Sequence, residues 1–542
     1  MEMIEQELSA FENAIVENIN GQVTVTIPKE ELHTIALWLH NEKKFDFLID
    51  IVGMDYGDRL GVIYYLSQSQ KPASVLKVKT STDNRDIPRL QSVYDLWASA
   101  NVYEREVYDF FGIEFLNHPD MRRIFLRADW KGFPFRKDYD PAREQNPVPL
   151  ENENLKEMEI IPSITLDGDR EVEHTHLLFD QDEYVINFGQ QHSAMHGVLH
   201  LRVSLDGEII RKIDPNFGYI HRGIEKMCES YTYPQILHLT ERLDYLSGNM
   251  NRHAVCLCCE KALGMEIPER AKVIRTLFDE LTRVASHLLG WGSMCMDMGA
   301  VTAFMYGMRD REKVMDIFEE TTGGRLMTIY YVIGGVANDL HPDFQKKVKE
   351  FIPYMRKKLK EHHLLFTGNP IARNRMKNIG RLSKEEAISL GATGPVGRAS
   401  GWHNDLRKII PYAAYDRVNF EEVIRNDGLT FDRYIIRLDE IEQSLRIIEQ
   451  LIDNIPDGAF VEKTKAVVKL PEGEYFQRVE NARGQFCVHI TSAGDKNPYR
   501  MKFRSPSLVL VGVLKEIALQ TKVADLIMLG GSLDYVIPCI DR

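Results

Sequence analysis

The sequence predicts an α+β protein, in which an N-terminal α+β domain is joined by a linker to a helical bundle with flanking β-structure. Three observations lead to this prediction. The chain has 542 residues, whereas a single hydrophobic core stops growing at roughly 250 to 300 residues, so more than one domain is expected. The first part of the chain mixes alternating apolar runs with helical stretches. The second part is dominated by apolar residues at the helical period.

Residues 1–141 form the expected N-terminal domain. The runs GQVTVTI and GVIYYLSQ alternate as half-buried strands do, whereas ELHTIALWLHNEK has helical spacing. The domain ends in a stretch rich in charged and aromatic residues, from Tyr103 to Pro141. Residues 142–182 follow, and because they are acidic and lack a sustained period we expect a linker there.

Residues 183–542 form the expected second domain, which begins with a β-hairpin. Apolar residues alternate through VLHLRVSL, and Asp206-Gly207 supplies a two-residue turn before EIIRKI. Pro268 then suits the first turn of a long helix, whose apolar residues recur at i, i+3, i+4 and i+7.

The rest of this domain is expected to be mainly helical. Further helices fit 309–320, 343–364 and 433–454, which indicates a helical bundle. From about Val467 short strands and turns return, and one more helix precedes the tail GGSLDYVIPCIDR. A mixed sheet packed on a large bundle is therefore expected.

The overall charge and hydropathy exclude several functions. The 67 basic and 80 acidic residues give a formal charge of −13, so nucleic acid is not an expected partner. The acidic start MEMIEQELSAFENAIVENI lacks the basic and apolar regions of a secretory signal. No apolar run approaches the roughly 18 residues of a spanning helix. Any membrane contact is expected to pass through partner proteins.

Cysteine usage does not indicate a metal site. The seven cysteines are an odd number in a long chain, which favours reduced thiols in the cytosol. The run CLCC at 256–259 contains C-x-x-C, but a zinc or iron–sulfur site needs a second pair at similar spacing. We interpret these cysteines as small apolar side chains on a buried helix. Because no G-x-G-x-x-G or P-loop motif occurs, the chain is not expected to hold NAD or ATP.

Two histidines, His192 and His196, lie in the sequence QHSAMHG just before the predicted hairpin. As metal ligands they would need a third partner, and their setting is a glycine-flanked loop that is free to project into a cavity. A loop histidine that donates a proton is the favoured interpretation, because imidazole titrates near neutrality.

The stretch ERLDYLSGN has two polar residues, Asp244 and Ser247, at the spacing of a metal clasp that lacks its thiolates. Tyr245 stands between them. A tyrosine considered by itself is most often an ordinary half-buried side chain. Asp297 lies among apolar residues in MCMDMGAV, and a carboxylate there must be paired, hydrogen-bonded or neutralised.

His287 lies on the long predicted helix, four residues after Arg283 and seven after Glu280. At this spacing the three residues share one polar stripe on an otherwise apolar helix. The simplest interpretation of His287 is a hydrogen-bonded histidine in the core.

Several long motifs resemble a known family. FGQQHSAMHGVLHLRVSLDGE, GYIHRGIEKM, ERLDYLSGN, GSMCMDMGAVTAF, SGWHNDLRK and NPYRMKFRSPS resemble the 49-kilodalton-type (D-type) polypeptide of respiratory complex I. YEREVYDFFGIEF, HPDMRRI and FRKDYDP resemble its 30-kilodalton-type (C-type) polypeptide. The whole chain except the linker therefore resembles a fused C/D subunit of a proton-pumping NADH-quinone oxidoreductase.

This family is related to the large subunit of nickel-iron hydrogenases, so the resemblance implies a hydrogenase-large-subunit-like bundle. Hydrogenases hold their metal with R-x-C-G-x-C and D-P-C-x-x-C. Here Asp244 and Ser247 occupy the first pair of places, and the stretch from Asp534 to Cys539 offers a single thiol. One thiolate cannot hold a nickel-iron centre, so a hydrogenase is disfavoured. The resemblance implies that the vacated cavity takes a quinone head group.

The resemblance also implies how a quinone would be reduced. Two protons reach the ring oxygens, and a phenol and an imidazole can both hydrogen-bond a carbonyl and then release a proton. By the family pattern Tyr245 and His196 are these donors, Asp297 fixes and recharges His196, and His192 belongs to the quinone loop.

The electrons would come from the terminal iron–sulfur cluster of a neighbouring polypeptide, because this chain has no set of cysteines for a cluster. Arg222, Arg242 and His287 line this chain's side of that cluster in the family pattern, and cationic neighbours raise a cluster's potential. The implied partners are the cluster-bearing B-type polypeptide and the membrane-embedded H-type polypeptide of complex I. The implied location is the cytoplasmic side of the bacterial inner membrane.

Two departures from the family pattern and two alternatives remain. Ser193 replaces the proline of the usual H-P-A-x-H loop, which favours a more mobile loop. Cys539 replaces the glutamate of the usual tail. The same module occurs in complexes fed by ferredoxin or another carrier instead of NADH. A non-catalytic scaffold that organises cluster-bearing polypeptides is the other alternative.

Overall fold

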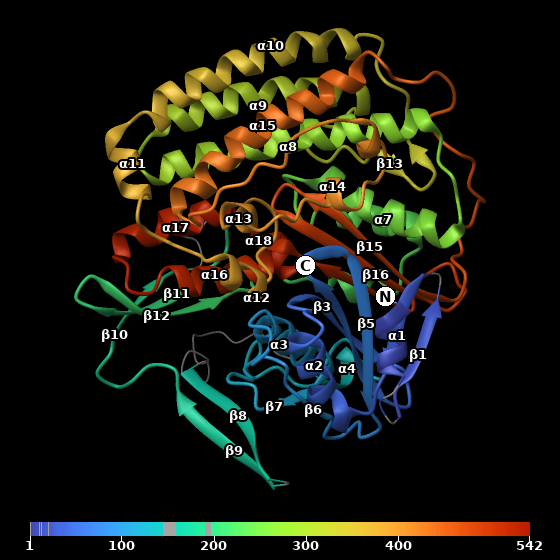
Figure 1. Cartoon of the computed structure of the whole chain (residues 1–542), viewed down its shortest axis with the longest axis vertical. Helices are drawn as coiled ribbons and strands as arrows, with labels where there is room; N and C mark the ends of the chain where they lie inside the picture. Colours follow the sequence, from blue (N-terminus) through green and yellow to red (C-terminus); the bar gives the residue numbers. More distant parts are fainter. Residues whose placement is uncertain are drawn as a thin grey trace.

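The computed structural model describes residues 2–9, 11, 13–19, 21–144, 159–168, 170–189 and 197–542. Long helices lie above several small sheets in the view of Figure 1. Helices and strands occur in both the N-terminal and the C-terminal part, so the predicted α+β class is confirmed. Within the described ranges no helix is both long and apolar enough to span a bilayer.

A five-stranded sheet forms the centre of the N-terminal part. The strand order is β1-β2-β5-β4-β3, in which β2 and β5 run parallel and the other neighbours antiparallel. The strands are β1 (Ile15–Ile19), β2 (Gln22–Thr26), β3 (Phe47–Asp55), β4 (Leu60–Gln68) and β5 (Lys71–Thr82). The strands predicted from GQVTVTI and GVIYYLSQ are β2 and β4.

The remaining elements of this part surround the sheet. They are α1 (Glu2–Leu8), α2 (Leu32–Asn41), β6 (Arg89–Gln91), α3 (Ala100–Phe111), β7 (Glu114–Leu116) and α4 (Pro141–Glu144). The helix predicted from ELHTIALWLHNEK is α2. Its Ile35 and Leu39, four residues apart, are both fully buried, as the predicted spacing requires.

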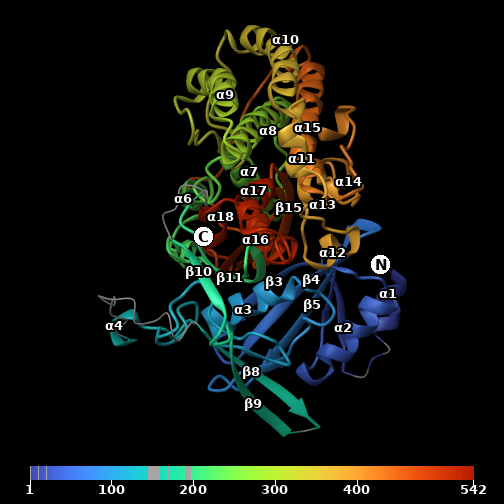
Figure 2. The ribbon, with the colours of Figure 1, turned by 90° about the vertical axis from the view of Figure 1, so that its left-hand side faces the viewer.

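The segment expected to be a linker contains regular structure. β8 (Ile160–Asp167) pairs antiparallel with β9 (Arg170–Leu177), and most side chains of β9 are exposed. The two strands project away from the rest of the molecule (Figures 1 and 2). The β-branched residues of IIPSITL favour a strand locally, although the acidic composition of the segment favoured a coil.

The predicted hairpin of the second part is confirmed, but its two-residue turn is Gly207-Glu208 and not Asp206-Gly207, because Asp206 pairs with Ile209. β11 (His200–Asp206) pairs antiparallel with β12 (Ile209–Asn216), and β10 (Tyr184–Phe188) lies on the other edge of β11. The apolar side chains of β11 lie in one core with those of the N-terminal sheet. The two parts of the chain therefore share buried surface.

Five long helices form the bundle in the upper part of Figure 1. They are α7 (Gly248–Leu263), α8 (Glu269–Asp297), α9 (Val301–Thr322), α10 (Phe344–His362) and α15 (Thr430–Ile452). α8 is buried along most of its length and packs against α9 and α15. The helices predicted over 309–320, 343–364 and 433–454 correspond to α9, α10 and α15.

Shorter elements connect this bundle. Before α7 come α5 (Ile224–Cys228) and α6 (Tyr233–Thr240), and β13 (Tyr331–Val332) pairs with β14 (Gly335–Val336). The helices between α10 and α15 are α11 (Pro370–Met376), α12 (Lys384–Ser389), α13 (Gly394–Ala399) and α14 (Leu406–Ile409).

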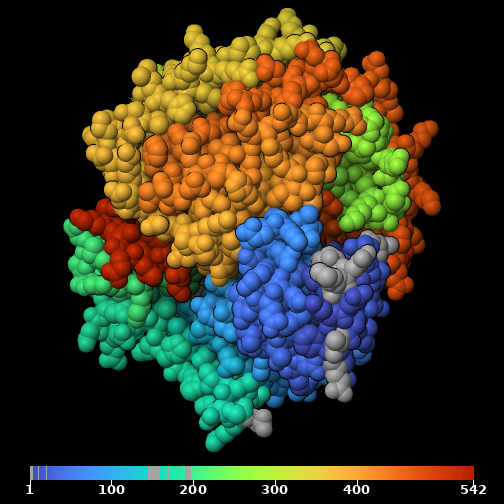
Figure 3. Space-filling model, viewed as in Figure 1, coloured from blue at the N-terminus to red at the C-terminus, as the bar shows by residue number. Residues whose placement is uncertain are grey.

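The C-terminal sheet lies between the bundle and the N-terminal sheet (Figure 1). It consists of β15 (Gly473–Asn481), β16 (Gly484–Ser492) and β17 (Arg500–Arg504), followed by α16 (Pro506–Ile517), α17 (Leu526–Leu533) and α18 (Ile537–Asp541). Arg504 donates to the carbonyl of Ile49 at 3.1 Å, and the ring of Tyr65 stacks on Phe476 at 3.9 Å. In Figure 3 the N-terminal residues, in blue, lie directly against the orange segments of the second part.

A buried cluster of charges joins the two parts where β17 meets α3 and α5. The carboxylate of Glu225 receives Arg500 Nη2 at 2.8 Å and Arg542 Nε at 3.2 Å. Lys502 and Arg542 both reach Glu106 on α3. Burial alone would raise the pKa of Glu225, but Lys502, Arg500 and Arg542 outweigh it and hold this pKa below its usual range.

Glu225→Ala is expected to destabilise the chain by roughly 3 to 5 kcal/mol, because removing one partner leaves buried cations without compensation. The shift of the urea-unfolding midpoint of the purified chain measures this loss. Glu208→Ala is the control. Glu208 pairs with Lys522 at 3.3 Å while both side chains are largely exposed, so little change is expected. Equal shifts for the two variants would contradict this account.

Candidate functional site

The turn between α6 and α7 directs neighbouring side chains in opposite directions. Asp244 and Ser247 are fully buried, whereas Tyr245 is 38% exposed. Ser247 begins α7 at its N-cap position. The phenol of Tyr245 accepts no hydrogen bond from the described residues and donates none to them. It therefore stands on the surface of the turn, and no described residue is hydrogen-bonded to its hydroxyl.

Tyr245 lines a cavity of about 470 Å³ together with Arg222 and Arg242. The other lining residues are Tyr219, Ile220, His221, Ile224, Met327, Pro538 and Arg542. Three of the residues singled out in the sequence therefore share one cavity. Both arginines are exposed, and neither forms an ion pair with a described residue.

The loop that carries Arg222 is held by the tail of the chain. The carboxylate of Asp541 accepts hydrogen bonds from the backbone N–H of Gly218 at 2.8 Å and of Ile220 at 3.0 Å. His221 Nδ1 donates to the carbonyl of Asp541 at 2.6 Å. Gly218 has φ +97°, and a Cβ there would lie 2.2 Å from the carbonyl oxygen of Phe125, so only glycine fits.

Arg483 lies beside the inward-facing residues of the α6–α7 turn. Its Nη1 donates to Asp244 at 2.9 Å, to Ser247 at 3.1 Å and to Ser286 at 3.2 Å. Arg483 belongs to the two-residue turn between β15 and β16, and its backbone N–H donates to Asn481 at 3.0 Å. A guanidinium therefore contacts both polar residues of the predicted clasp.

Cys539, the single thiol of the tail motif, is buried on α18. Its sulfur lies 2.9 Å from Ser505 Oγ, and burial raises the pKa of this thiol to about 11. The three cysteines of the CLCC run are buried on α7, in agreement with their apolar interpretation. No group of three or more potential metal ligands occurs in the part of the chain that the structure describes.

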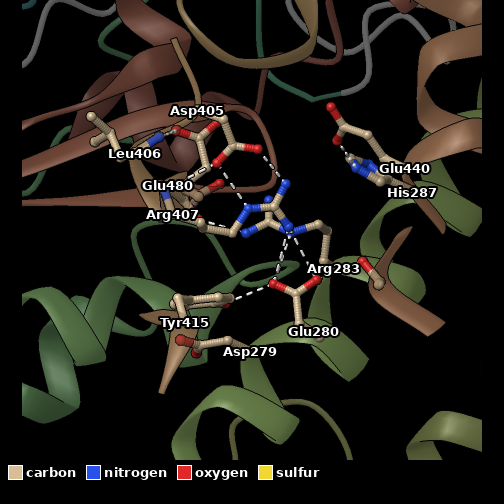
Figure 4. Close-up of polar contacts among 12 residues, drawn as sticks. Asp279, Glu280, Arg283, His287, Asp405, Leu406, Arg407, Tyr415, Glu440 and Glu480 are labelled. Carbon is tan, nitrogen blue, oxygen red and sulfur yellow. Dashed lines mark hydrogen bonds and ion pairs between the residues drawn. The ribbon is translucent and has the colours of Figure 1, made fainter. Parts of the chain in front are cut away.

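The polar stripe predicted on α8 is confirmed and fully buried (Figure 4). Glu280 accepts hydrogen bonds from Tyr415 and Ser444 at 2.6 Å and from Arg407 at 3.1 Å. Arg407 also donates to Asp405 at 2.6 Å. Burial alone would raise the pKa of Glu280, but Arg407 and its other donors lower it.

His287 lies inside this network and not on the wall of the cavity. Its Nε2 lies 2.8 Å from Glu440 on α15, and the same carboxylate receives Arg398 Nη2 at 2.7 Å. Arg398 Nη1 in turn donates to Glu480 at 2.7 Å. Burial lowers the pKa of His287, and the neighbouring Glu440 partly offsets this. The interpretation as a hydrogen-bonded core histidine is thus confirmed.

Of the remaining predicted residues, the structure describes only Asp297. Asp297 is the last residue of α8 and is half-buried, and its charge raises the pKa of the Tyr535 phenol, although burial is the larger cause. It does not line the cavity of Tyr245. His192 and His196 lie outside the described residues. The next residue, Gly197, packs against Ile537, since a Cβ there would lie 2.6 Å from that side chain.

Sequence reasoning missed Arg483 and Glu440 and treated Asp541 only as part of the tail. Each of these residues acts on a partner far along the chain: Arg483 is 239 positions from Asp244, and Asp541 is 323 positions from Gly218. No local period or motif reports such contacts. The one available signal was the presence of charged residues inside otherwise apolar strands and helices.

Two family models match the chain. Residues 25–145 match the model of the respiratory-chain NADH dehydrogenase 30 Kd subunit, and residues 297–469 and 461–542 match that of the 49 Kd subunit. The C/D subunit of NADH-quinone oxidoreductase from Phocaeicola vulgatus is 54% identical over 519 residues, which are 96% of this chain and 99% of the relative. The chain belongs to this C/D subunit family of an oxidoreductase complex.

Two further relatives match either the whole chain or its second part. The C/D subunit from Bacteroides thetaiotaomicron is 54% identical over 526 residues, 94% of this chain and 98% of the relative. The D-type subunit of NADH-quinone oxidoreductase from Bacillus mycoides is 44% identical over 361 residues, 66% of this chain and 99% of the relative. The predicted resemblance to complex I is therefore confirmed.

Asp541→Asn is expected to flatten the dependence of stability on pH between about 4 and 6. Burial raises the pKa of Asp541 to about 6, above the value of about 3.9 in an unfolded chain. The contribution of this carboxyl is therefore fully present below pH 4 and is lost as the pH rises to about 6. Between these pH values the wild-type chain should lose about 2 to 3 kcal/mol of its free energy of unfolding through this carboxyl, and the Asp541→Asn chain should not.

Urea unfolding of both chains at a series of pH values measures this difference. Asp180→Asn changes a carboxyl whose side chain is 79% exposed and serves as the control. An unchanged slope for Asp541→Asn would show that this carboxyl does not titrate in the expected range.

Proposed function

We propose that this chain forms the quinone-reduction site of a proton-pumping NADH-quinone oxidoreductase, in which Tyr245 donates a proton to the quinone. The position of Tyr245 carries the proposal. Its phenol stands on the wall of a cavity of about 470 Å³, in a chain whose relatives are named for quinone reduction. A cavity of this size suits a small ring, because ligand pockets measure about 300 to 1,000 Å³.

The chemistry of the phenol suits this role. Burial raises the pKa of Tyr245, so the side chain remains protonated at neutral pH and has a proton to give. The quinone receives two electrons and two protons to become a quinol. One of these protons passes from the hydroxyl of Tyr245 to a ring oxygen of the quinone. The phenolate is then reprotonated from solvent through the open cavity.

His196 is the proposed second donor, with His192 on the same loop and Asp297 as the carboxylate that orients and recharges His196. The contact of Gly197 with Ile537 supports this role, because the next residue, Pro538, lines the cavity of Tyr245. The chain that follows His196 therefore begins beside the cavity wall.

The electrons are proposed to come from an iron–sulfur cluster in the neighbouring B-type polypeptide of the complex. Arg222 and Arg242 line the same cavity without ion-pair partners among the described residues, and exposed cations of this kind favour an anionic neighbour. A second cavity of about 520 Å³ shares His221 and Arg222 with the first and adds aromatic lining such as Trp130. His287 lines neither cavity, and its proposed place near the cluster rests on the family pattern.

The remaining proposals concern the setting of the chain. The membrane-embedded H-type polypeptide is the proposed partner at the entrance for quinone, and the chain is proposed to lie on the cytoplasmic side of the bacterial inner membrane. NADH is the proposed electron source, since the relatives are named NADH-quinone oxidoreductases.

Tyr245→Phe is expected to lower quinone reductase activity of the assembled complex by at least about 100-fold, because general acid catalysis contributes roughly 10²- to 10⁴-fold. Tyr231→Phe is the matched control, since Tyr231 is 37% exposed but does not line the cavity. Turnover and sensitivity to quinone-site inhibitors should be measured for both. A Tyr245→Phe complex with normal turnover would exclude this residue as the donor.

Purification of the complex through this chain is expected to recover a flavin-bearing polypeptide, because NADH gives its electrons as a hydride and a flavin can accept one. Mass spectrometry of the complex and its flavin absorbance provide the measurement. An intact complex that lacks flavin and accepts electrons from reduced ferredoxin would show that ferredoxin, and not NADH, is the electron source.

A further inference from the structure

We propose that Arg483 is a positioning residue for quinone reduction: its fixed guanidinium stabilises the phenolate that Tyr245 becomes when it gives its proton to the quinone. This inference rests on the proposed role of Tyr245 and adds a residue that does not line the cavity. Arg483 itself neither gains nor loses a proton in this step. It acts on the acid strength of its neighbour.

The first support is the way in which Arg483 is held. The residue is 1% exposed and makes three hydrogen bonds through Nη1, to Asp244, Ser247 and Ser286. Two of these partners belong to the turn that carries Tyr245 itself. The guanidinium is therefore held in place against the turn that carries Tyr245, so the stabilising charge needs no rearrangement when the phenolate forms.

The second support is the incomplete pairing of the guanidinium. Nε and Nη2 of Arg483 are buried and have no hydrogen-bond partner among the described residues. Its second anionic neighbour, Asp534, lies 3.6 Å from Nη2, beyond hydrogen-bond distance, and also 3.6 Å from Arg437 Nε. Although two carboxylates face Arg483, its charge still acts at low dielectric on a negative charge that develops nearby.

The charges that act on the Tyr245 phenol come from four elements. Burial is the largest cause of its raised pKa, and Asp244 of the same turn and Asp534 at the end of α17 raise it further. Arg483 of the β15–β16 turn lowers this pKa, and so does Arg311 of α9 to a smaller extent. Arg483 is thus the main group that opposes burial.

Other cations near the cavity are less suited to this role. Arg242 is exposed, so water and salt screen its charge. Arg222 lies on a separate loop held by Asp541. Of these cations, only Arg483 is both fully buried and hydrogen-bonded to the turn of Tyr245.

The reaction balances without further groups. The two electrons would come, one at a time, from the iron–sulfur carrier proposed for the neighbouring polypeptide. One O–H bond of Tyr245 breaks and one O–H bond forms on a quinone oxygen, while the second proton comes from the second donor. The negative charge that remains on Tyr245 is the species that Arg483 stabilises until solvent returns a proton.

Three variants of the assembled complex test the proposal. Arg483→Met should lower quinone reductase turnover at least about 10-fold and move the alkaline limb of the pH profile upward, because the phenol becomes a weaker acid. Arg483→Lys keeps a cation and should restore most of the turnover. Asp244→Asn removes an opposing charge at nearly constant shape and should move the alkaline limb downward.

If Arg483 had only a structural role, Arg483→Met and Asp244→Asn would not shift the alkaline limb of the pH profile in opposite directions. If Arg483→Met and Asp244→Asn lose activity alike with an unshifted limb, Arg483 only holds the turn and the proposal is overturned. If Arg483→Met does not assemble, the double variant Arg483→Met/Asp244→Asn removes both charges of the pair. The alkaline limb of this double variant should return close to that of the wild type. An unshifted alkaline limb in Asp244→Asn alone would overturn the proposal.

The Tyr245→Phe background separates this inference from the proposed function. Arg483→Met should cause no additional loss of turnover there, since the phenolate no longer forms. Full turnover of the Tyr245→Phe complex would refute Tyr245 as the proton donor. If Tyr245→Phe loses turnover but Arg483→Met keeps it, only the proposed role of Arg483 is refuted. Electron transfer to the water-soluble acceptor ferricyanide reports the integrity of the upstream carriers in every variant.

Discussion

Pairing of buried arginines with carboxylates is the constraint on which the rest of the structure depends. Arg398, Arg407 and Arg483 are almost completely removed from water, and each contacts at least one buried carboxylate. An unpaired charge in such surroundings would cost several kcal/mol, so each arginine requires its partner in a fixed place. These partners come from α8, α15, β15 and the turn before α7. The ion pairs therefore determine how the helical bundle meets the C-terminal sheet.

The same constraint divides the site into an inner and an outer face. Asp244 turns inward to meet Arg483, and the adjacent Tyr245 consequently turns outward into the cavity. On the neighbouring loop, Asp541 holds the backbone of Gly218 and Ile220, which leaves the side chain of Arg222 at the surface. Rigid polar contacts behind the wall thus present a phenol and cationic groups on its front, as a preorganised site requires.

Local patterns in the sequence sufficed for much of the fold. The alternation in VLHLRVSL identified β11, and the helical period after Pro268 identified α8, because both depend on neighbours within a few residues. The hairpin β8–β9 was missed, because the acidic composition around it outweighed the β-branched residues of β8. Tyr245, Arg222 and Arg242 were found through the family resemblance, and the structure places them on one cavity. Arg483 could not be found in this way, because its contacts with Asp244 and Ser247 form only when β15 folds against α7.

The charge cluster around Glu106 has a consequence for how the complex is built. The D-type relative from Bacillus mycoides is a separate polypeptide that aligns with 66% of this chain. If the two parts of this chain were separate, the contacts of Glu106 with Lys502 and Arg542 would have to form between molecules, at a rate that depends on the concentration of both. In the fused chain the covalent connection keeps the parts at a high effective concentration and in equal numbers. A shortage of one part can therefore never leave the apolar surface of the other without its cover.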